Sequence, residues 1–293
     1  MTLNEYLKEN YSATSINSYI NMIDRYLLYM GQRAERALYN DVLDYVSYLR
    51  KTKCHPKTIK NNLFAVKIYY HYLISTGKRK DHPCIDLNLQ DKIDRSIAVE
   101  ELYKPKELEE LLEKSKTRKS SLHERNKVII SLLIYQALTV LEISQLNTND
   151  INLEAGTINI KGNVKNNGRT LNLRTNQIML LHRYITESRP KLTLRQAQGK
   201  VNKETEALIT STTGKRIDPH SISCQINNSL GKYKRITPIK IRQSVIANLL
   251  KSGNDIRVVQ VFAGHKRASS TEAYRRSGLD ELKSAINRLH PLQ

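Results

Sequence analysis

Apolar residues in the first 80 positions repeat with the period of an α-helix. Between residues 16 and 30 they fall at i, i+3, i+4 and i+7, and Gly31 follows as a stop signal. A second amphipathic stretch covers 42–49, and a third begins at Pro56, a residue that the first turn of a helix tolerates. The first nine residues predict a further short helix. The pattern therefore predicts a compact helical domain over residues 1–80.

Residues 81–104 carry no sustained helical stripe and contain a proline, which predicts a linker. A second domain, 105–293, starts with a short helix and a very apolar one at 128–138. The period then changes to two across 151–173, which predicts a small three-stranded antiparallel sheet. The polar, basic stretch 189–206 predicts an exposed loop. Other helices are expected at 175–188, about 219–230, 238–252, 255–263 and 268–276. The fold class is therefore mainly α, with one small sheet in the second domain.

Composition places the chain among ordinary globular proteins, with 39% hydrophobic and 26% charged residues. The three cysteines, which lie far apart in sequence and form no CxxC motif, suit a reducing cytosol better than a disulfide scaffold or a zinc site. The longest apolar run, 128–141, is short of the roughly 20 residues that span a bilayer, and the first residues lack the pattern of a signal peptide. These features predict a cytoplasmic protein without a membrane span.

Charge changes the picture, because the chain carries a formal net charge of +20. Residues 1–150 hold 23 basic and 19 acidic side chains, whereas residues 151–293 hold 25 and 9. Within the first part, residues 51–80 contain eight Lys or Arg and no acid. Two separated basic surfaces favour a polyanionic partner, of which nucleic acid is the most common.

The segment 237–274 contains an ordered set of residues that can carry chemistry. Arg242 lies on a predicted helix that ends in Leu-Leu-Lys-Ser-Gly, Gly264-His265 follows, and Thr-Glu-Ala-Tyr ends at Tyr274. This order and spacing resemble the C-terminal signature of the tyrosine recombinase (phage integrase) family, with a chain of Xer-like size. The helical first domain, the linker and the small sheet extend the resemblance to the whole chain.

The resemblance implies a site-specific recombinase or integrase that breaks and rejoins DNA through a 3′-phosphotyrosyl intermediate. Tyr274 would be the nucleophile, Arg242 would clamp the charge that develops on the phosphate, and His265 would bond the same phosphate or take the tyrosine proton. A lysine in the turn between two strands would protonate the leaving 5′-hydroxyl. Lys165 fits that turn best, with Lys161 as the alternative. Bond energy is conserved in the phosphotyrosyl linkage, so neither a metal nor another cofactor is required.

Two positions depart from the family pattern. The helix–turn segment T-G-L-R-x-S-E-L reads Thr-Val-Leu-Glu-Ile-Ser-Gln-Leu here, with Glu142 at the position of the first catalytic arginine. In H-x-x-R the histidine is replaced by Ile239. A carboxylate at the arginine position would repel the phosphate by roughly 4 kcal/mol at about 4 Å and an effective dielectric near 20, unless Glu142 points away and pairs with a local Arg or Lys. Lys240 is a candidate substitute cation.

These departures leave two functional alternatives. The first is a divergent but active recombinase, and the second is a catalytically impaired paralogue that binds DNA as an accessory protein. In either case Lys57, Lys60 and Lys67 are the expected phosphate contacts of the first domain. The family further implies a homotetramer on two double-stranded DNA sites, C-terminal segments such as 278–293 exchanged between subunits, accessory DNA-bending proteins, and a biological reaction such as integration, excision, inversion or dimer resolution on a mobile genetic element or chromosome.

Overall fold

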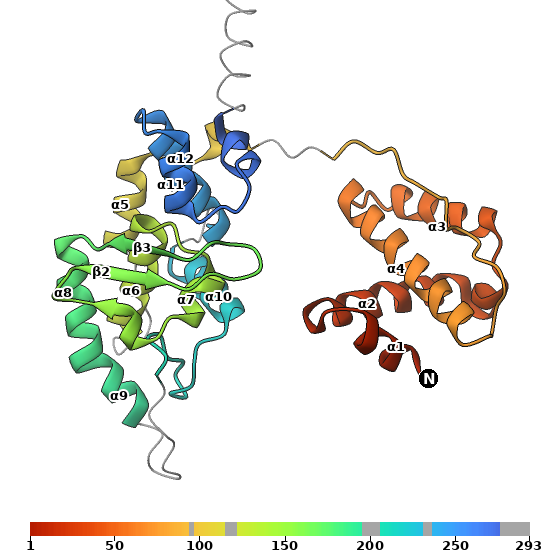
Figure 1. Cartoon of the computed structure of the whole chain (residues 1–293), viewed down its shortest axis with the longest axis horizontal. Helices are drawn as coiled ribbons and strands as arrows, with labels where there is room; N and C mark the ends of the chain where they lie inside the picture. Colours follow the sequence, from red (N-terminus) through yellow and green to blue (C-terminus); the bar gives the residue numbers. More distant parts are fainter. Residues whose placement is uncertain (94–96, 115–121, 195–205, 231–235, 276–293) are drawn as a thin grey trace, which may run out of the picture. The chain divides into compact units, whose positions relative to one another are not determined.

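The computed structural model describes the chain apart from residues 94–96, 115–121, 195–205, 231–235 and 276–293 (Figure 1). Its contacts divide the chain into two compact units, residues 1–95 and 96–293. The division falls within the segment 81–104, which the polar pattern predicts as a linker. The expected exchanged segment 278–293 lies outside the described residues.

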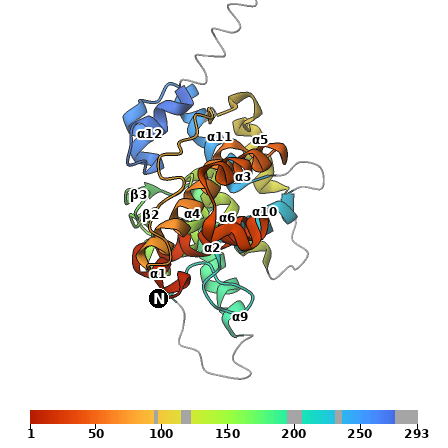
Figure 2. The same cartoon turned by 90° about the vertical axis from the view of Figure 1, so that its right-hand side faces the viewer.

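The first unit is helical, as the 3.6-residue period predicts. Helices α2 and α4 lie side by side and form its centre (Figure 2). Gly31, with a φ of 58°, caps α2, and Pro56 occupies the first turn of α4. The helices of this unit are α1 (Leu3–Asn10), α2 (Ala13–Met30), α3 (Tyr39–Lys51) and α4 (Pro56–Ser75), with a 3₁₀ turn at Gly31–Arg36.

Tyrosines fill much of the core of the first unit. The rings of Tyr26 and Tyr45 meet edge to face with centroids 5.0 Å apart. The Tyr26 and Tyr70 hydroxyls are 2.5 Å apart, and Tyr70 donates to the carbonyl of Ala34 at 2.9 Å, so the buried phenols are hydrogen-bonded. Cys84, from the segment expected to be a linker, is buried in the same core. The chain after α4 therefore continues to pack on the first unit.

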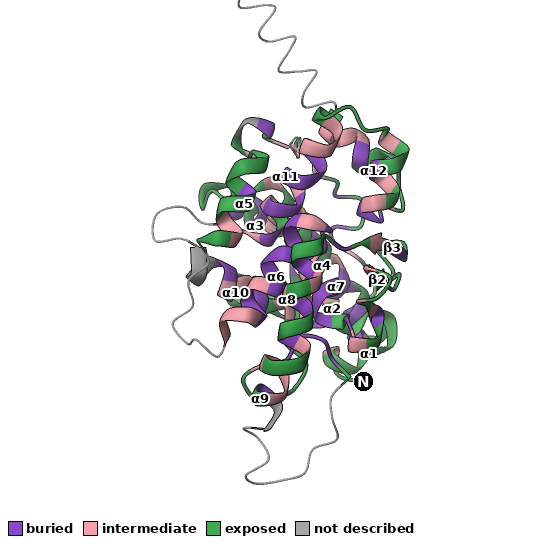
Figure 3. Cartoon of the chain, turned by 90° about the vertical axis from the view of Figure 1, so that its left-hand side faces the viewer, coloured by how far each residue is buried: buried purple, intermediate pink, exposed green. Residues whose placement is uncertain are grey.

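The second unit is built around α6, which is buried along almost its whole length (Figure 3). Helices α5, α8, α10 and α11 all pack against it. Its observed bounds are His123–Tyr135, so the expected end at 138 is wrong. The chain instead turns sharply at Ala137, whose φ of 49° lies in the left-handed region. The elements of this unit are a 3₁₀ turn at Val99–Glu101, α5 (Pro105–Glu113), α6, α7 (Val140–Gln145), a 3₁₀ turn at Thr148–Asp150, β1 (Ile151–Asn152), β2 (Thr157–Ile160), β3 (Arg169–Asn172), α8 (Thr175–Arg183), a π-helical turn at Tyr184–Ser188, α9 (Arg189–Leu194), α10 (Pro219–Leu230), α11 (Pro238–Lys251) and α12 (Ile256–Ala263).

The three strands form the small antiparallel sheet that the two-residue period predicts, in the order β1-β2-β3. Ile158 lies opposite Leu171, and Ile160 lies opposite Arg169. Ile158 and Ile160 face the core, because alternate residues of a strand share one face. The connection between β2 and β3, residues 161–168, is the loop in which the sequence predicts the catalytic lysine.

A second sequence expectation about the helices is also wrong. The sequence predicts an exposed loop over 189–206, but residues 189–194 form α9 and continue the helix begun by α8, while residues 195–205 lie outside the described residues. Leu192 is buried in the core of the second unit and holds this extension in place. Pro190 favours the loop interpretation in the sequence, yet it lies within this continuous helix, directly after the π-helical turn at Tyr184–Ser188, where the regular hydrogen-bond ladder is already interrupted. No helix in the described part of the chain is long and apolar enough to cross a bilayer.

Candidate active site

Tyr274 and His265 lie against each other at the C-terminal end of the described second unit. Their rings are nearly parallel, with centroids 6.5 Å apart and an interplanar angle of 13°. His265 follows directly after α12, and its Nδ1 is 2.9 Å from the hydroxyl oxygen of Thr271. Tyr274 lies in the helical stretch 269–275 and packs on the buried side chains of α11 and α12, which include Ile246. The phenol and the imidazole are therefore supplied by one chain.

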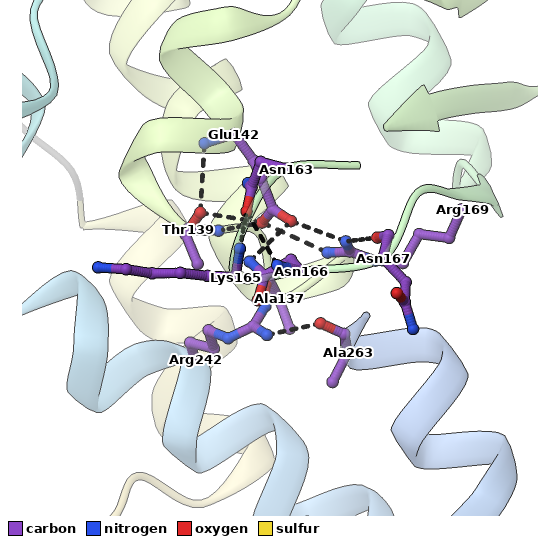
Figure 4. Close-up of polar contacts among 10 residues, drawn as sticks. All are labelled: Ala137, Thr139, Glu142, Asn163, Lys165, Asn166, Asn167, Arg169, Arg242 and Ala263. Carbon is purple, nitrogen blue, oxygen red and sulfur yellow. Dashed lines mark hydrogen bonds and ion pairs between the residues drawn. The ribbon is translucent and has the colours of Figure 1, made fainter. Parts of the chain in front are cut away.

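Arg242 brings a buried cation to the same place. It lies on α11 with 9% of its surface exposed, and it donates to the carbonyl of Ala137 and, at 2.6 Å, to that of Ala263 (Figure 4). Ala263 ends α12, immediately before the turn that carries His265, and also contacts the Tyr274 cluster. The two carbonyls fix the direction of the guanidinium without neutralising its charge.

The electrostatic environment keeps both rings neutral near pH 7. Burial lowers the pKa of His265 to about 4, and the positive charges of Arg242 and Arg169 act in the same direction, while Glu142 opposes them. Burial also raises the pKa of Tyr274, an effect that Arg242 partly offsets. A neutral imidazole can accept a proton, and a protonated phenol needs a base before it can attack.

Glu142 does not face the site as a free carboxylate, because it is paired with Arg169. The carboxylate and guanidinium side chains are 1% and 2% exposed, and Glu142 Oε1 is 2.7 Å from Arg169 Nη1 (Figure 4). Glu142 also accepts from the Thr139 amide at 2.8 Å as part of a capping box at the start of α7. Burial alone would raise the pKa of Glu142, but the bonds from Arg169 and Thr139 outweigh it and hold that pKa below its usual value.

The loop between β2 and β3 is tied both to this pair and to the turn that carries His265. The Asn166 amide group donates to Glu142 Oε1 at 3.1 Å, and the Asn167 backbone N–H donates to the carbonyl of Gly264 at 2.8 Å. Asn166 also forms a β-bridge with His265. A single connected network therefore joins the start of α7, the β2–β3 loop and the imidazole turn.

Comparison with known protein families identifies the family to which the chain belongs. A model of the phage integrase family matches residues 101–280, and a model of the phage integrase N-terminal SAM-like domain matches residues 3–77. The chain belongs to the phage integrase family. The resemblance found in segment 237–274 is confirmed, and so is the mainly helical fold with one small sheet.

Relatives and solved structures agree with this membership along nearly the whole chain. The tyrosine recombinase XerD of Oceanobacillus iheyensis is 26% identical over 293 residues, covering 97% of this chain and 95% of the relative. The tyrosine recombinase XerC of Roseiflexus castenholzii is 28% identical and covers 97% and 89%. The XerH site-specific recombinase bound to palindromic difH substrate superposes with a TM-score of 0.71 at 18% identity, covering 94% of this chain and 80% of XerH. The Tn1549 transposon integrase in complex with circular intermediate DNA gives 0.64 at 16%, covering 97% and 99%. Both structures share the fold.

Of the two lysines considered for the family's general acid, Lys161 begins the β2–β3 loop and Lys165 lies near its middle. The Lys165 side chain is exposed and points away from the polar cluster in Figure 4. The Lys161 ammonium is 3.6 Å from the carboxylate of Asp150, with its side chain 68% exposed. Neither ammonium is among the groups that contact Tyr274 in the described residues.

At the second departure from the family pattern, Ile239 is 70% exposed in the first turn of α11. Its neighbour Lys240, the candidate substitute cation, forms an ion pair with Glu101 at 3.2 Å and lies over the ring of Tyr103. The Lys240 charge is therefore already paired within the chain. Among the described residues, no three His, Cys, Asp or Glu side chains come together as a metal site.

The sequence interpretation missed the role of two side chains in this network. No sequence motif singles out Arg169, although a buried carboxylate at position 142 requires a cation. Thr271 appeared only as part of the T-x-x-Y pattern, although its hydroxyl bonds the imidazole. A signal for Arg169 is present in the sequence, because Glu142 is the one charged residue between positions 128 and 149 and β3 begins with an arginine.

Proposed function

We propose that this chain is a site-specific recombinase that breaks and rejoins DNA with Tyr274 as nucleophile. The observation that carries the proposal is the meeting of Tyr274, His265 and Arg242 within one unit, in a chain of the phage integrase family. Family membership supports a DNA breaking-rejoining enzyme. DNA as the substrate is further supported by the net charge of +20 and by relatives of this fold that were solved with DNA.

The chemistry proceeds as an exchange of one phosphodiester for another. The Tyr274 oxygen forms a bond to phosphorus, its proton passes to His265 through the Nε2 that Thr271 leaves available, and the bond to the 5′-oxygen breaks. A lysine of the β2–β3 loop, Lys165 or alternatively Lys161, gives its proton to that leaving oxygen. Arg242 stabilises the negative charge of the pentavalent transition state from a buried, pre-oriented position. The reverse sequence with a second 5′-hydroxyl restores the DNA backbone.

The first unit would supply one of two basic surfaces that contact the duplex. Residues 1–80 act as a core-binding domain, residues 81–104 link it to the catalytic domain 105–293, and phosphates are contacted by basic side chains of α4. Lys57 is exposed and Lys60 half-buried there, and the Lys67 ammonium donates to the Ile85 carbonyl at 2.7 Å. A homotetramer on two recombination sites is the assembly that family membership implies for this function, and accessory DNA-bending proteins are further candidate partners.

The second candidate is a DNA-binding accessory protein that no longer cleaves. It is favoured by the absence of a guanidinium on position 142 and of an imidazole on position 239. A nicked suicide substrate separates the two candidates. The recombinase leaves a protein–DNA adduct that resists denaturant and is lost in Tyr274→Phe, whereas an accessory protein gives only salt-sensitive complexes, identical in wild type and in the variant.

A further inference from the structure

The buried ion pair at position 142 stands where the family carries an arginine. Glu142 Oε1 is 2.7 Å and Oε2 3.4 Å from the two terminal nitrogens of Arg169. A glutamate side chain and one hydrogen bond together reach about as far from the Cα as an arginine side chain does. The guanidinium of Arg169 therefore lies near where a guanidinium carried by position 142 would be, but it arrives from β3 rather than from α7.

Five donor contacts converge on this one carboxylate. They come from the Thr139 amide and hydroxyl, from Asn166 and from both terminal nitrogens of Arg169, with distances of 2.7 to 3.4 Å. A carboxylate with this many donors remains charged when buried, and it fixes each donor in direction. Removing the charge but keeping the shape would leave a guanidinium buried without a counterion.

The pair is also coupled to the reacting groups through short contacts. Arg169 Nη1 lies next to Gly264, since a Cβ built on that glycine would come within 2.5 Å of it. The β2–β3 loop bonded to Glu142 holds the Gly264 carbonyl through Asn167. A shift of Arg169 would therefore move the His265 turn, and with it the imidazole that packs on Tyr274.

We propose that Glu142 and Arg169 are positioning residues of this site, which hold the β2–β3 loop and the His265 turn in the geometry needed for attack. The proposal rests on the recombinase function given above. It implies that restoring the family arginine alone, in Glu142→Arg, places two guanidinium groups in one buried space and damages the site. The arginine becomes acceptable at position 142 only when residue 169 is changed to an acid.

The test uses the full chain and four variants, of which Glu142→Arg restores the family arginine alone. Glu142→Gln keeps the side-chain shape and an acceptor oxygen for the Thr139 amide, but it removes the charge and replaces the second acceptor oxygen by an N–H donor. The double variant Glu142→Arg/Arg169→Glu reverses the pair. Glu110→Gln is the matched control, because Glu110 belongs to an exposed pair with Lys114 in the same unit. Two quantities are measured: the single-turnover rate of adduct formation on saturating nicked DNA, and hydrogen exchange of the peptide that contains Asn167.

The expected result is a rate lowered by on the order of 10- to 100-fold in Glu142→Gln, with faster exchange at Asn167 and DNA affinity within about twofold of wild type. The double variant should recover both the rate and the protection, and the control should change neither. If Glu142→Gln does not fold, Arg169→Lys replaces it, because lysine keeps the charge and loses the two-nitrogen contact with Glu142. The same loss of rate and the same faster exchange at Asn167 are then expected.

Three results would overturn the proposal. The first two are unchanged rate and exchange in Glu142→Gln, and an adduct rate above wild type in Glu142→Arg alone. A double variant that regains thermal stability and exchange protection but not rate would also overturn it, because the pair would then be merely structural. If wild type forms no adduct at all, the recombinase function fails, and exchange at Asn167 alone decides whether the pair holds the loop.

Discussion

Gly264→Ala tests whether the guanidinium of Arg169 is fixed beside the imidazole turn. The glycine has a φ of 69°, in the left-handed region that costs an L residue roughly 1 to 2 kcal/mol. A Cβ there would lie 2.5 Å from Arg169 Nη1, 3.0 Å from its Cζ and 3.0 Å from the Asn167 carbonyl oxygen. Glu142 holds that guanidinium, so it cannot move aside as the free end of a flexible side chain would.

A second glycine separates the backbone cost of Gly264→Ala from the cost of its steric clash. Gly253 has a φ of 85° and nothing within 4 Å of its built Cβ, so Gly253→Ala carries the backbone cost without the clash. Overpacking adds about 1 to 3 kcal/mol at Gly264, and breaking the Glu142–Arg169 pair would raise the loss to about 3 to 5 kcal/mol. We therefore expect Gly264→Ala to destabilise the chain by at least about 1 kcal/mol more than Gly253→Ala does.

Urea unfolding followed by circular dichroism measures this difference, provided that the dependence on denaturant is the same in both variants. The adduct-forming rate on a nicked substrate should fall in Gly264→Ala and stay near wild type in Gly253→Ala. Equal losses of stability and equal rates in the two variants would refute the reasoning, because the guanidinium would then not be fixed beside residue 264.

The remaining predictions concern the imidazole and the loop lysines. Burial lowers the pKa of His265 from 6.5 to about 4 in the folded chain. Between these two pH values the unfolded chain binds a proton at this residue and the folded chain does not. The free energy of unfolding must therefore fall as the pH drops from about 6.5 towards 4. Urea unfolding should show this slope reduced in His265→Gln, and an equal slope in both proteins would contradict the buried neutral imidazole. For the general acid, Lys165→Ala should lower the rate on a normal 5′-hydroxyl leaving group and be rescued by a 5′-thiol leaving group, which needs no proton. If Lys161→Ala shows this rescue instead, Lys161 is the acid.

The helices and the sheet follow from local patterns that a sequence displays directly. Period-3.6 stripes predicted α2 and α4, and alternation predicted the three strands, because each element buries one face of its own. The extension of the helix through 189–194 could not be predicted in this way. It depends on the packing of Leu192 against residues distant in sequence, and Pro190 suggested the opposite locally.

The candidate site was predictable to the extent that its motif is contiguous. Tyr274 and His265 lie nine residues apart, and their contact follows from one helix and one turn. The partner of Glu142 lies 27 residues away on a strand, and a sequence gives no measure of whether two such groups meet. The sequence alone therefore left open whether this carboxylate repels the phosphate or pairs with a local cation.

The two departures from the family pattern differ in physical kind. Ile239 is 70% exposed. The isoleucine therefore removes the hydrogen-bond donor of the family's histidine and adds no buried interaction in its place. Glu142 is buried, charged and bonded to groups on α7, on β3 and in the loop between β2 and β3, so its presence builds a structure that a guanidinium at the same position would break. A chain that had only lost catalytic function would be expected to accumulate changes of the first kind. A buried glutamate at position 142 needs a compatible arginine at position 169. This matched pair beside His265 favours a site that has changed its architecture and kept its function over a site that has lost its function.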